Sequence, residues 1–149
     1  MTPHETARAI VAANNYLTLA TADRDGRPWA SPVYYTPDGD TDFYWVSRPE
    51  SRHSRNIAER PEVGIVIYDT QVPIGAAEAV YLTARAEAVG DADLDRCAEI
   101  FRRRYPEDLA SFTPERLRPP HELRLYRARV VDASVLLNDG GPDIRVPLG

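Results

Sequence analysis

Lysine is absent from this 149-residue sequence, and cysteine and methionine occur only once each. Every one of the 18 basic residues is therefore an arginine, which excludes any chemistry that needs a Schiff-base lysine. The single cysteine, Cys97, excludes an intrachain disulfide. The longest apolar run, at 63–68, is far too short to span a membrane. The histidines, His4, His53 and His121, are scattered without metal-ligand spacing, so we expect no metal site.

Net charge and length narrow the classes of protein further. The formal charge is −5, and a general nucleic-acid binder would carry a basic face instead. The first five residues are polar and do not resemble a signal peptide. We therefore expect one domain over residues 1–149, located in the cytoplasm, with no nucleic-acid or membrane partner.

The most informative segment is Ser-Arg-His-Ser-Arg-Asn-Ile at 51–57. It follows a short aromatic strand predicted at 42–47, and it opens a helix that Pro61 stops after Arg60. Ser51 is a good N-cap, and the free N–H groups of a first helical turn attract anions. Arginine adds a planar fork that matches phosphate oxygens. The segment therefore predicts a phosphate site, and its alternative is a capped, solvated surface helix.

The N-terminal half alternates short strands with turns. Thr2-Pro3-His4-Glu5 is typical of a capping box and predicts a helix. The hairpin turns expected at 23–26 and 37–40 carry Asp23, Asp25, Asp38 and Asp40, which we interpret as turn residues rather than as a catalytic pair. The strands predicted in this half lie at 16–21, 29–36, 42–47 and 63–68.

The C-terminal half begins with strict apolar alternation at 79–89, which predicts a half-buried antiparallel strand. A helix capped by Asp91 or Asp93 follows, with one apolar face, and a shorter helix starts at Pro114. The remaining strands are predicted at 123–131 and in a final hairpin of 134–138 with 144–148. About seven short strands with few helices are typical of a mainly β fold, a small antiparallel barrel with helices at its margins.

Residues 14–90 resemble the pyridoxamine-phosphate-oxidase-like split-barrel flavoproteins. The resemblance rests on the order of four pieces: the hairpin around DRDGRP, the strand ending in SPVYY, the aromatic strand leading into SRHSRNI, and ERPEV after that helix. The strand AVYLTARAEAV is similar to a later strand of the family. The resemblance implies a split, Greek-key type antiparallel β-barrel that binds FMN, or the deazaflavin F420, at the interface of a homodimer.

The resemblance also implies where the cofactor would lie. The phosphate contacts of the family fall on Ser51, Arg52 and His53. The strands facing the isoalloxazine ring fall on Ala30 to Tyr34 and on Trp45 to Ser47. We therefore expect the remaining cofactor contacts at Ser31, Pro32, Val33, Trp45, Val46 and Ser47.

Two departures from the family pattern bear on function. The usual lysine is His53 here; a nearby phosphate can protonate it, and Arg55 can compensate for the missing charge. The family's vitamin B6 oxidases end in a segment with a basic pair that contacts pyridoxal phosphate. The final residues LLNDGGPDIRVPLG lack that pair, so we do not expect vitamin B6 oxidation.

Several interpretations stay open at this point. The chain is either an FMN- or F420-dependent oxidoreductase acting on a small or planar substrate, or a non-catalytic protein that holds flavin or another planar ligand. No catalytic residue is identified. Cys97 is interpreted as part of the core, and Arg102–Arg104 as a solvated helix end rather than an anion site. The six aromatic residues expected to give a homodimer its apolar patch are Trp29, Tyr34, Tyr35, Phe43, Tyr44 and Trp45.

Overall fold

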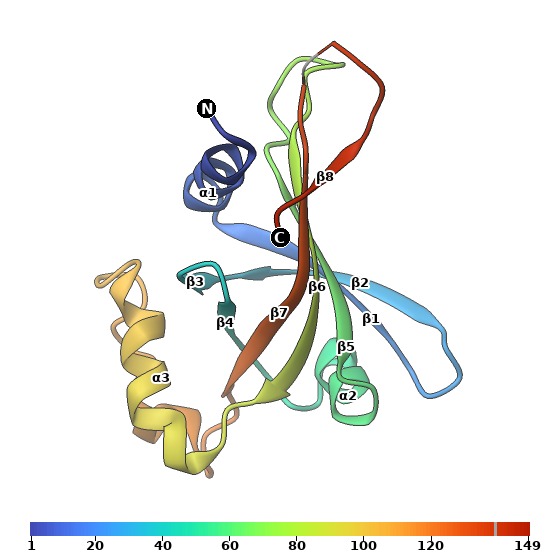
Figure 1. The fold of residues 1–149 in the computed structure, drawn as a ribbon. Helices are drawn as coiled ribbons and strands as arrows, with labels where there is room; N and C mark the ends of the chain where they lie inside the picture. The colour runs from blue at the N-terminus through green and yellow to red at the C-terminus, as the bar shows by residue number, and fades with distance from the viewer. Residues whose placement is uncertain (139) are drawn as a thin grey trace.

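A single antiparallel sheet of eight strands organises the protein in a computed structural model, which describes residues 1–138 and 140–149 (Figure 1). The strand order is β2-β1-β5-β6-β7-β4-β3, with β8 paired to β7. The strands are β1 Tyr16–Ala22, β2 Pro28–Tyr34, β3 Thr36–Asp38, β4 Asp42–Ser47, β5 Glu62–Tyr68, β6 Ala79–Ala88, β7 Arg124–Leu136 and β8 Arg145–Pro147. One residue separates β2 from β3, although they lie at opposite ends of the strand order. The sheet therefore curls into the expected half-open antiparallel barrel.

Within the described residues, three α-helices and one 3₁₀ helix flank the sheet (Figure 1). They are α1 Pro3–Ala13, α2 Arg52–Glu59, α3 Asp91–Arg103 and η1 Pro114–Leu117. The capping box at α1 is confirmed, because Thr2 and Glu5 each bond the other's backbone N–H. The predicted cap of α3 is wrong: its N-cap is Gly90, and Asp91 lies inside the first turn, where a carboxylate favours the helix dipole.

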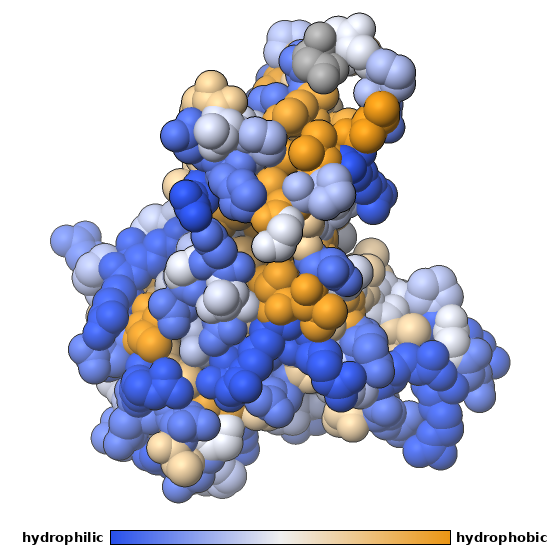
Figure 2. All heavy atoms as spheres, in the orientation of Figure 1, coloured by the Kyte–Doolittle hydropathy of each residue, from blue (hydrophilic) through white to orange (hydrophobic). Residues whose placement is uncertain are grey.

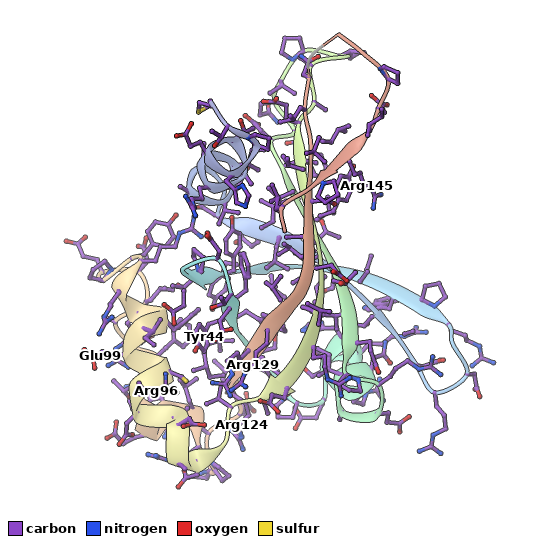
Figure 3. All side chains as sticks on the ribbon, viewed as in Figure 1. Tyr44, Arg96, Glu99, Arg124, Arg129 and Arg145 are labelled. Atoms are coloured by element: carbon purple, nitrogen blue, oxygen red, sulfur yellow. The ribbon has the colours of Figure 1, made fainter. Side chains whose placement is uncertain are left out.

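Strand β4 is buried on both faces. Phe43 and Trp45 point into the barrel interior, where the Trp45 ring stacks on Tyr126 at 6.1 Å between centroids. Tyr44 and Val46 point outward into a second apolar cluster, which α3 covers. Figure 3 shows Tyr44 between β4 and α3. Two hydrophobic cores therefore share this one strand.

This double burial corrects the predicted aromatic patch. Four of its six members, Tyr35, Phe43, Tyr44 and Trp45, are at most 3% exposed within one chain. The alternation does turn Tyr44 outward, but α3 covers it. Other apolar side chains are exposed instead, among them Ile74 and Ile144 in loops beside the β7–β8 arm. Figure 2 shows hydrophobic side chains gathered along that arm.

Two predicted strand boundaries also differ from the structure. The strand expected at 29–36 is divided at Tyr35, whose N–H donates to the Asn15 carbonyl at 3.1 Å. The strands expected at 123–131 and 134–138 form one long β7, which passes through a register shift where Val131 lies between the paired residues 130 and 132. The loop of the final predicted hairpin, between 138 and 144, includes residue 139, which lies outside the described residues.

Arg104 joins the end of α3 to the end of α1. Its guanidinium donates to the carbonyls of Val11 (3.1 Å), Asn14 (2.5 Å) and Tyr35 (2.6 Å), and it lies over the Tyr35 ring at 4.5 Å. The last turn of α1 has no basic residue of its own, so a distant arginine satisfies its carbonyls. The helix end predicted to be solvated is therefore partly structural, as Arg102 also donates to the Phe112 carbonyl at 2.9 Å.

Replacing Arg104 with alanine is expected to lower the free energy of unfolding by about 2–3 kcal/mol, because several hydrogen bonds from one charged group are lost together. Urea unfolding followed by circular dichroism measures this change. Arg103→Ala is the matched control, since Arg103 is exposed and forms a surface ion pair with the exposed Glu99. Equal midpoints for the two variants would contradict a clamping role for Arg104.

Candidate functional site

The N-terminus of α2 follows directly from β4 and forms a cluster of hydroxyl and imidazole groups. Ser51 is the N-cap: its Oγ accepts from the Ser54 N–H and donates to the Arg48 carbonyl at 2.9 Å. The Arg55 N–H donates to the Ser51 carbonyl at 2.9 Å, which begins the helical ladder. The amides of Arg52 and His53, in the first turn, have no intrahelical partner by helix geometry. This end of α2 therefore has the donors and the dipole that an anion requires.

His53 connects this helix to β4. Its Nε2 lies 2.8 Å from the Ser47 Oγ and 3.3 Å from the Ser51 Oγ. Burial lowers the pKa of His53 below the ordinary histidine value, so the ring is neutral at pH 7. A neutral imidazole accepts or donates one hydrogen bond at Nε2 but brings no positive charge. The free protein therefore lacks the second cation that a lysine would supply here.

Arg52 connects the same helix to β2. Its guanidinium lies over the Trp29 ring, 4.4 Å from the centroid. Deeper in α2, the buried Asn56 donates to the Thr21 hydroxyl of β1 at 3.0 Å. These contacts hold α2 across the inner face of β1 and β2. Together with the contact of His53 to Ser47, they place the predicted phosphate segment beside β2 and β4, the two strands predicted to face the isoalloxazine ring.

The strand residues predicted to face a cofactor divide into two groups. On β4, the Trp45 side chain is fully buried in the core, and only Ser47 among the three predicted residues reaches the His53 ring. On β2, Pro32 is exposed and Val33 is buried. Strand β3 pairs with β4 only at residues 42–44, so the edge of β4 beyond Tyr44 is not covered by β3. These positions could offer backbone edges and small side chains to a ring.

A small cavity of about 250 Å³ lies beside α2. It is lined by Asp23, Arg52, Arg55, Asn56 and Glu59. Hydrogen bonds from the backbone, first that of Arg27, hold the pKa of Asp23 below its usual value. The wall therefore carries two acidic residues, Asp23 and Glu59, as well as two arginines. Within residues 1–138 and 140–149, no three His, Cys, Asp or Glu side chains are arranged to hold a metal ion.

Sequence reasoning missed two contacts that shape this site. Trp29 was interpreted only as part of an exposed aromatic patch, yet it supports the Arg52 guanidinium. The Asn56–Thr21 bond was not anticipated, because 35 residues separate the partners. An asparagine inside a short helix was the one available signal, since a buried amide needs a partner.

The curled sheet with a capped helix at the end of its aromatic strand defines the class of split-barrel proteins. The sequence model of the family described as Pyridoxamine 5'-phosphate oxidase matches residues 3–134, and this chain belongs to that family. A search of curated proteins found no match. Across the described residues, no helix is both long enough and apolar enough to cross a membrane.

Solved structures with the same fold carry different functional descriptions. A heme binding protein from Mycobacterium smegmatis is similar with TM-score 0.76 and 23% identity, over 99% of this chain and 57% of that one. This chain thus spans little more than half of that protein. HutZ, the heme storage protein from Vibrio cholerae, is similar with TM-score 0.74 and 19% identity, over 92% of this chain and 95% of that one. An F420 reductase is similar with TM-score 0.61 and 20% identity, over 86% of this chain and 95% of that one. At these identities the likeness shows the fold alone.

The half-buried, neutral imidazole of His53 predicts a pH dependence of stability. Because its folded-state pKa is lowered, the unfolded chain binds the proton more readily, and stability falls as pH decreases below about 6.5. We expect His53→Gln to reduce the loss of stability between pH 7 and pH 5, measured by urea midpoints at each pH. The same substitution at exposed His121 is the control, and we expect it to leave the pH dependence unchanged. Parallel pH profiles for His53→Gln and the parent protein would contradict this assignment.

Proposed function

We propose that this protein binds FMN with its phosphate at the N-terminus of α2, and that it is an FMN-dependent oxidoreductase acting on a small or planar substrate. One observation carries the proposal. The Ser51 cap, the first-turn amides and Arg52 all belong to the start of α2, which contacts Ser47 of β4 through His53 and Trp29 of β2 through Arg52. Anion-binding groups next to strand edges suit a planar ring that carries a phosphate.

The residues present fit a phosphate with one reservation. Arg52 can direct its planar fork at phosphate oxygens while its ring contact with Trp29 restricts where the guanidinium lies. Ser51 and Ser47 bring hydroxyl groups, and His53 can rotate or gain a proton when an anion arrives. The reservation is the missing lysine charge. Bound FMN would supply the hydride chemistry, while the chain binds and orients it.

F420 is the second flavin-like candidate, and its acidic tail would need an additional basic groove. Arg27, Arg102 and Arg104 could line such a groove, but each already has partners within the chain. Arg27 lies 3.8 Å from Asp23 and 3.7 Å from Asp25, while Arg102 and Arg104 donate to backbone carbonyls. These contacts favour FMN over F420.

A non-catalytic protein for a planar ligand is the other candidate class. The observation that favours it is the neutral, half-buried imidazole of His53, because neutral imidazole is a common ligand for metal ions. Similar structures are described as heme binding and heme storage proteins. Titrations of the purified protein with FMN, F420 and hemin, each followed by absorbance, distinguish these candidates. Tight binding of F420 or hemin with FMN excluded would overturn the proposal.

Binding alone does not separate an enzyme from a reservoir. Anaerobic stopped-flow mixing of the FMN-loaded protein with NADPH or NADH tests whether the flavin is reduced. Mixing of the reduced protein with quinones or nitroaromatic acceptors tests whether the electrons leave again. Reduction and reoxidation faster than for free FMN support an oxidoreductase, whereas rates equal to those of free FMN support storage.

Arg52→Ala is expected to weaken FMN binding roughly ten- to hundredfold, because a charge-assisted hydrogen bond to phosphate is worth about 1.5–3 kcal/mol. Flavin fluorescence quenching measures the dissociation constants. Arg55→Ala and Arg24→Ala are matched controls with smaller expected effects, since Arg24 pairs with Glu59 at 3.3 Å on the surface. Equal affinities for all three variants would place the phosphate elsewhere.

We also propose a homodimer with the cofactor sites at its interface. Helices α1 and α2 pack on the inner side of the sheet, and α3 covers the outer side at β4. Within the described residues, no helix covers the outer side of β1, β2 and β5. Ala20 lies there, opposite Ala30 on one side and Gly64 on the other. Such small side chains give a flat surface that a second copy could approach closely by two-fold symmetry.

Light scattering at low micromolar concentration is expected to give about twice the 16.7 kDa chain mass. Ala20→Arg is expected to shift the protein toward monomer, because a long charged side chain separates the two flat surfaces. Ala13→Arg at the exposed end of α1 is the matched control and should remain dimeric. A monomeric parent protein with FMN still bound would refute both the dimer and the shared site.

A further inference from the structure

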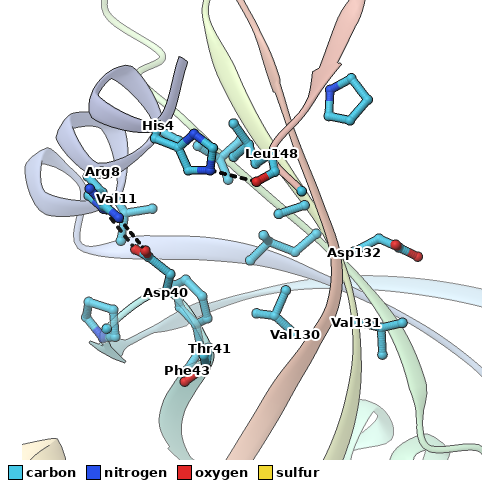
Figure 4. A pocket seen from close by; sticks show the side chains of 18 of the residues that line it. His4, Arg8, Val11, Asp40, Thr41, Phe43, Val130, Val131, Asp132 and Leu148 are labelled. Carbon is cyan, nitrogen blue, oxygen red and sulfur yellow. Dashed lines mark hydrogen bonds and ion pairs between the residues drawn. The ribbon is translucent and has the colours of Figure 1, made fainter. Parts of the chain in front are cut away.

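A cavity lies at the other end of the barrel from α2, under α1. Its volume is about 800 Å³, which falls within the range of sites for small molecules. Its apolar wall includes Val11 of α1, Phe43 of β4, Leu82 of β6, Val130 of β7 and Leu148 near β8. Figure 4 shows these elements around the open space.

The cavity results from an interruption along one edge of β7. Strand β4 pairs with β7 at 124–129, and β8 pairs with it at 134–136, so neither strand pairs with residues 130–133. The register shift beside Val131 falls in this gap. Backbone bonds close its two ends, from Val130 to the Thr41 carbonyl at 2.8 Å and from Leu148 to the Ala133 carbonyl at 2.9 Å. The opening is therefore a built feature of the sheet.

Helix α1 crosses this gap and is fixed on both sides. Arg8 and Asp40 form a two-bond ion pair at 2.6 and 3.1 Å, which joins α1 to the turn between β3 and β4. On the other side, the His4 ring lies 2.6 Å from the Leu148 carbonyl. Figure 4 shows both contacts on the α1 side of the cavity, while the Asp132 carboxylate points away from it.

The charges at the mouth determine which ligand suits the cavity. Both guanidinium bonds of Arg8 go to Asp40, so the pair is neutral as a unit. Among the described lining residues the basic ones are Arg8 and His4, and His4 already contacts the Leu148 carbonyl. A carboxylate or phosphate entering this apolar space would therefore lose hydration without gaining a free cation from them. An uncharged ligand loses little hydration, and its apolar surface gains the contacts that the wall offers.

We propose that this cavity is a binding site for an uncharged, largely apolar small molecule, distinct from the phosphate site at α2. The barrel interior between the two ends is filled. Trp45, which lies between Phe43 and Ser47 on β4, is buried and stacks on the buried Tyr126 of β7. The two sites therefore differ in both position and chemistry, and this proposal does not depend on FMN being the cofactor.

The test uses the full chain and the neutral fluorophore N-phenyl-1-naphthylamine. We expect saturable binding of one molecule per chain, displaced by dodecanol but at least tenfold less effectively by dodecanoate, which has the same chain length and a negative charge. Excess FMN should not displace the fluorophore. Displacement by FMN, or equal displacement by alcohol and carboxylate, would overturn the proposal.

Variants locate the binding in the cavity. Val11→Trp fills the space from α1 and is expected to weaken fluorophore binding at least tenfold, whereas Ala9→Trp, on the exposed side of the same helix, should not. If Val11→Trp does not fold by circular dichroism, Ala133→Leu fills the cavity from β7 and serves in its place. Unchanged binding in the folded filling variant would refute the site. Occupation of the cavity by a second copy of the chain would also refute the site. In that case the parent protein would not bind the fluorophore, and Val11→Trp would convert it to a monomer.

Discussion

The burial of β4 on both faces is the constraint on which the rest of the structure depends. Four consecutive side chains, from Phe43 to Val46, are withdrawn from water within one chain. Each contributes about 1.5–3 kcal/mol through the apolar surface it buries. Because the inner pair belongs to the barrel core and the outer pair to the α3 core, neither core can shift without the other. The strand thus fixes where the chain emerges at Ser47, and with it the position of α2.

Local patterns made much of the fold predictable. Alternation of apolar residues placed β6 within one residue of its observed end, and cap residues placed the starts of α1 and α2. The predictions were wrong where contacts between residues far apart in the sequence determine the local structure. The strands predicted separately at 123–131 and 134–138 are one continuous β7, because pairing with β6 resumes on both sides of the register shift. The role of Arg104 could not be predicted, since its acceptors are 69–93 residues away.

The candidate site was predictable only where it is contiguous. Ser51, Arg52 and His53 lie in one helical turn, so their spacing alone indicates an anion site. Trp45 shows the limit of such reasoning. An aromatic residue next to the site could line a pocket or fill the core, and the sequence does not indicate which face of β4 its side chain occupies; in the structure it stacks on Tyr126 in the core. The cavity under α1 combines five separate segments, and no short motif contains it.

The length of β4 sets a strict relation between the two ends of the barrel. Phe43 and Ser47 are four residues apart, which corresponds to roughly 13 Å along an extended strand. Because β4 is paired to β7 from Asp42 to Ser47, the sheet fixes this separation. Thermodynamic linkage then requires symmetry: whatever a ligand at one end does to affinity at the other, the second ligand does equally to the first.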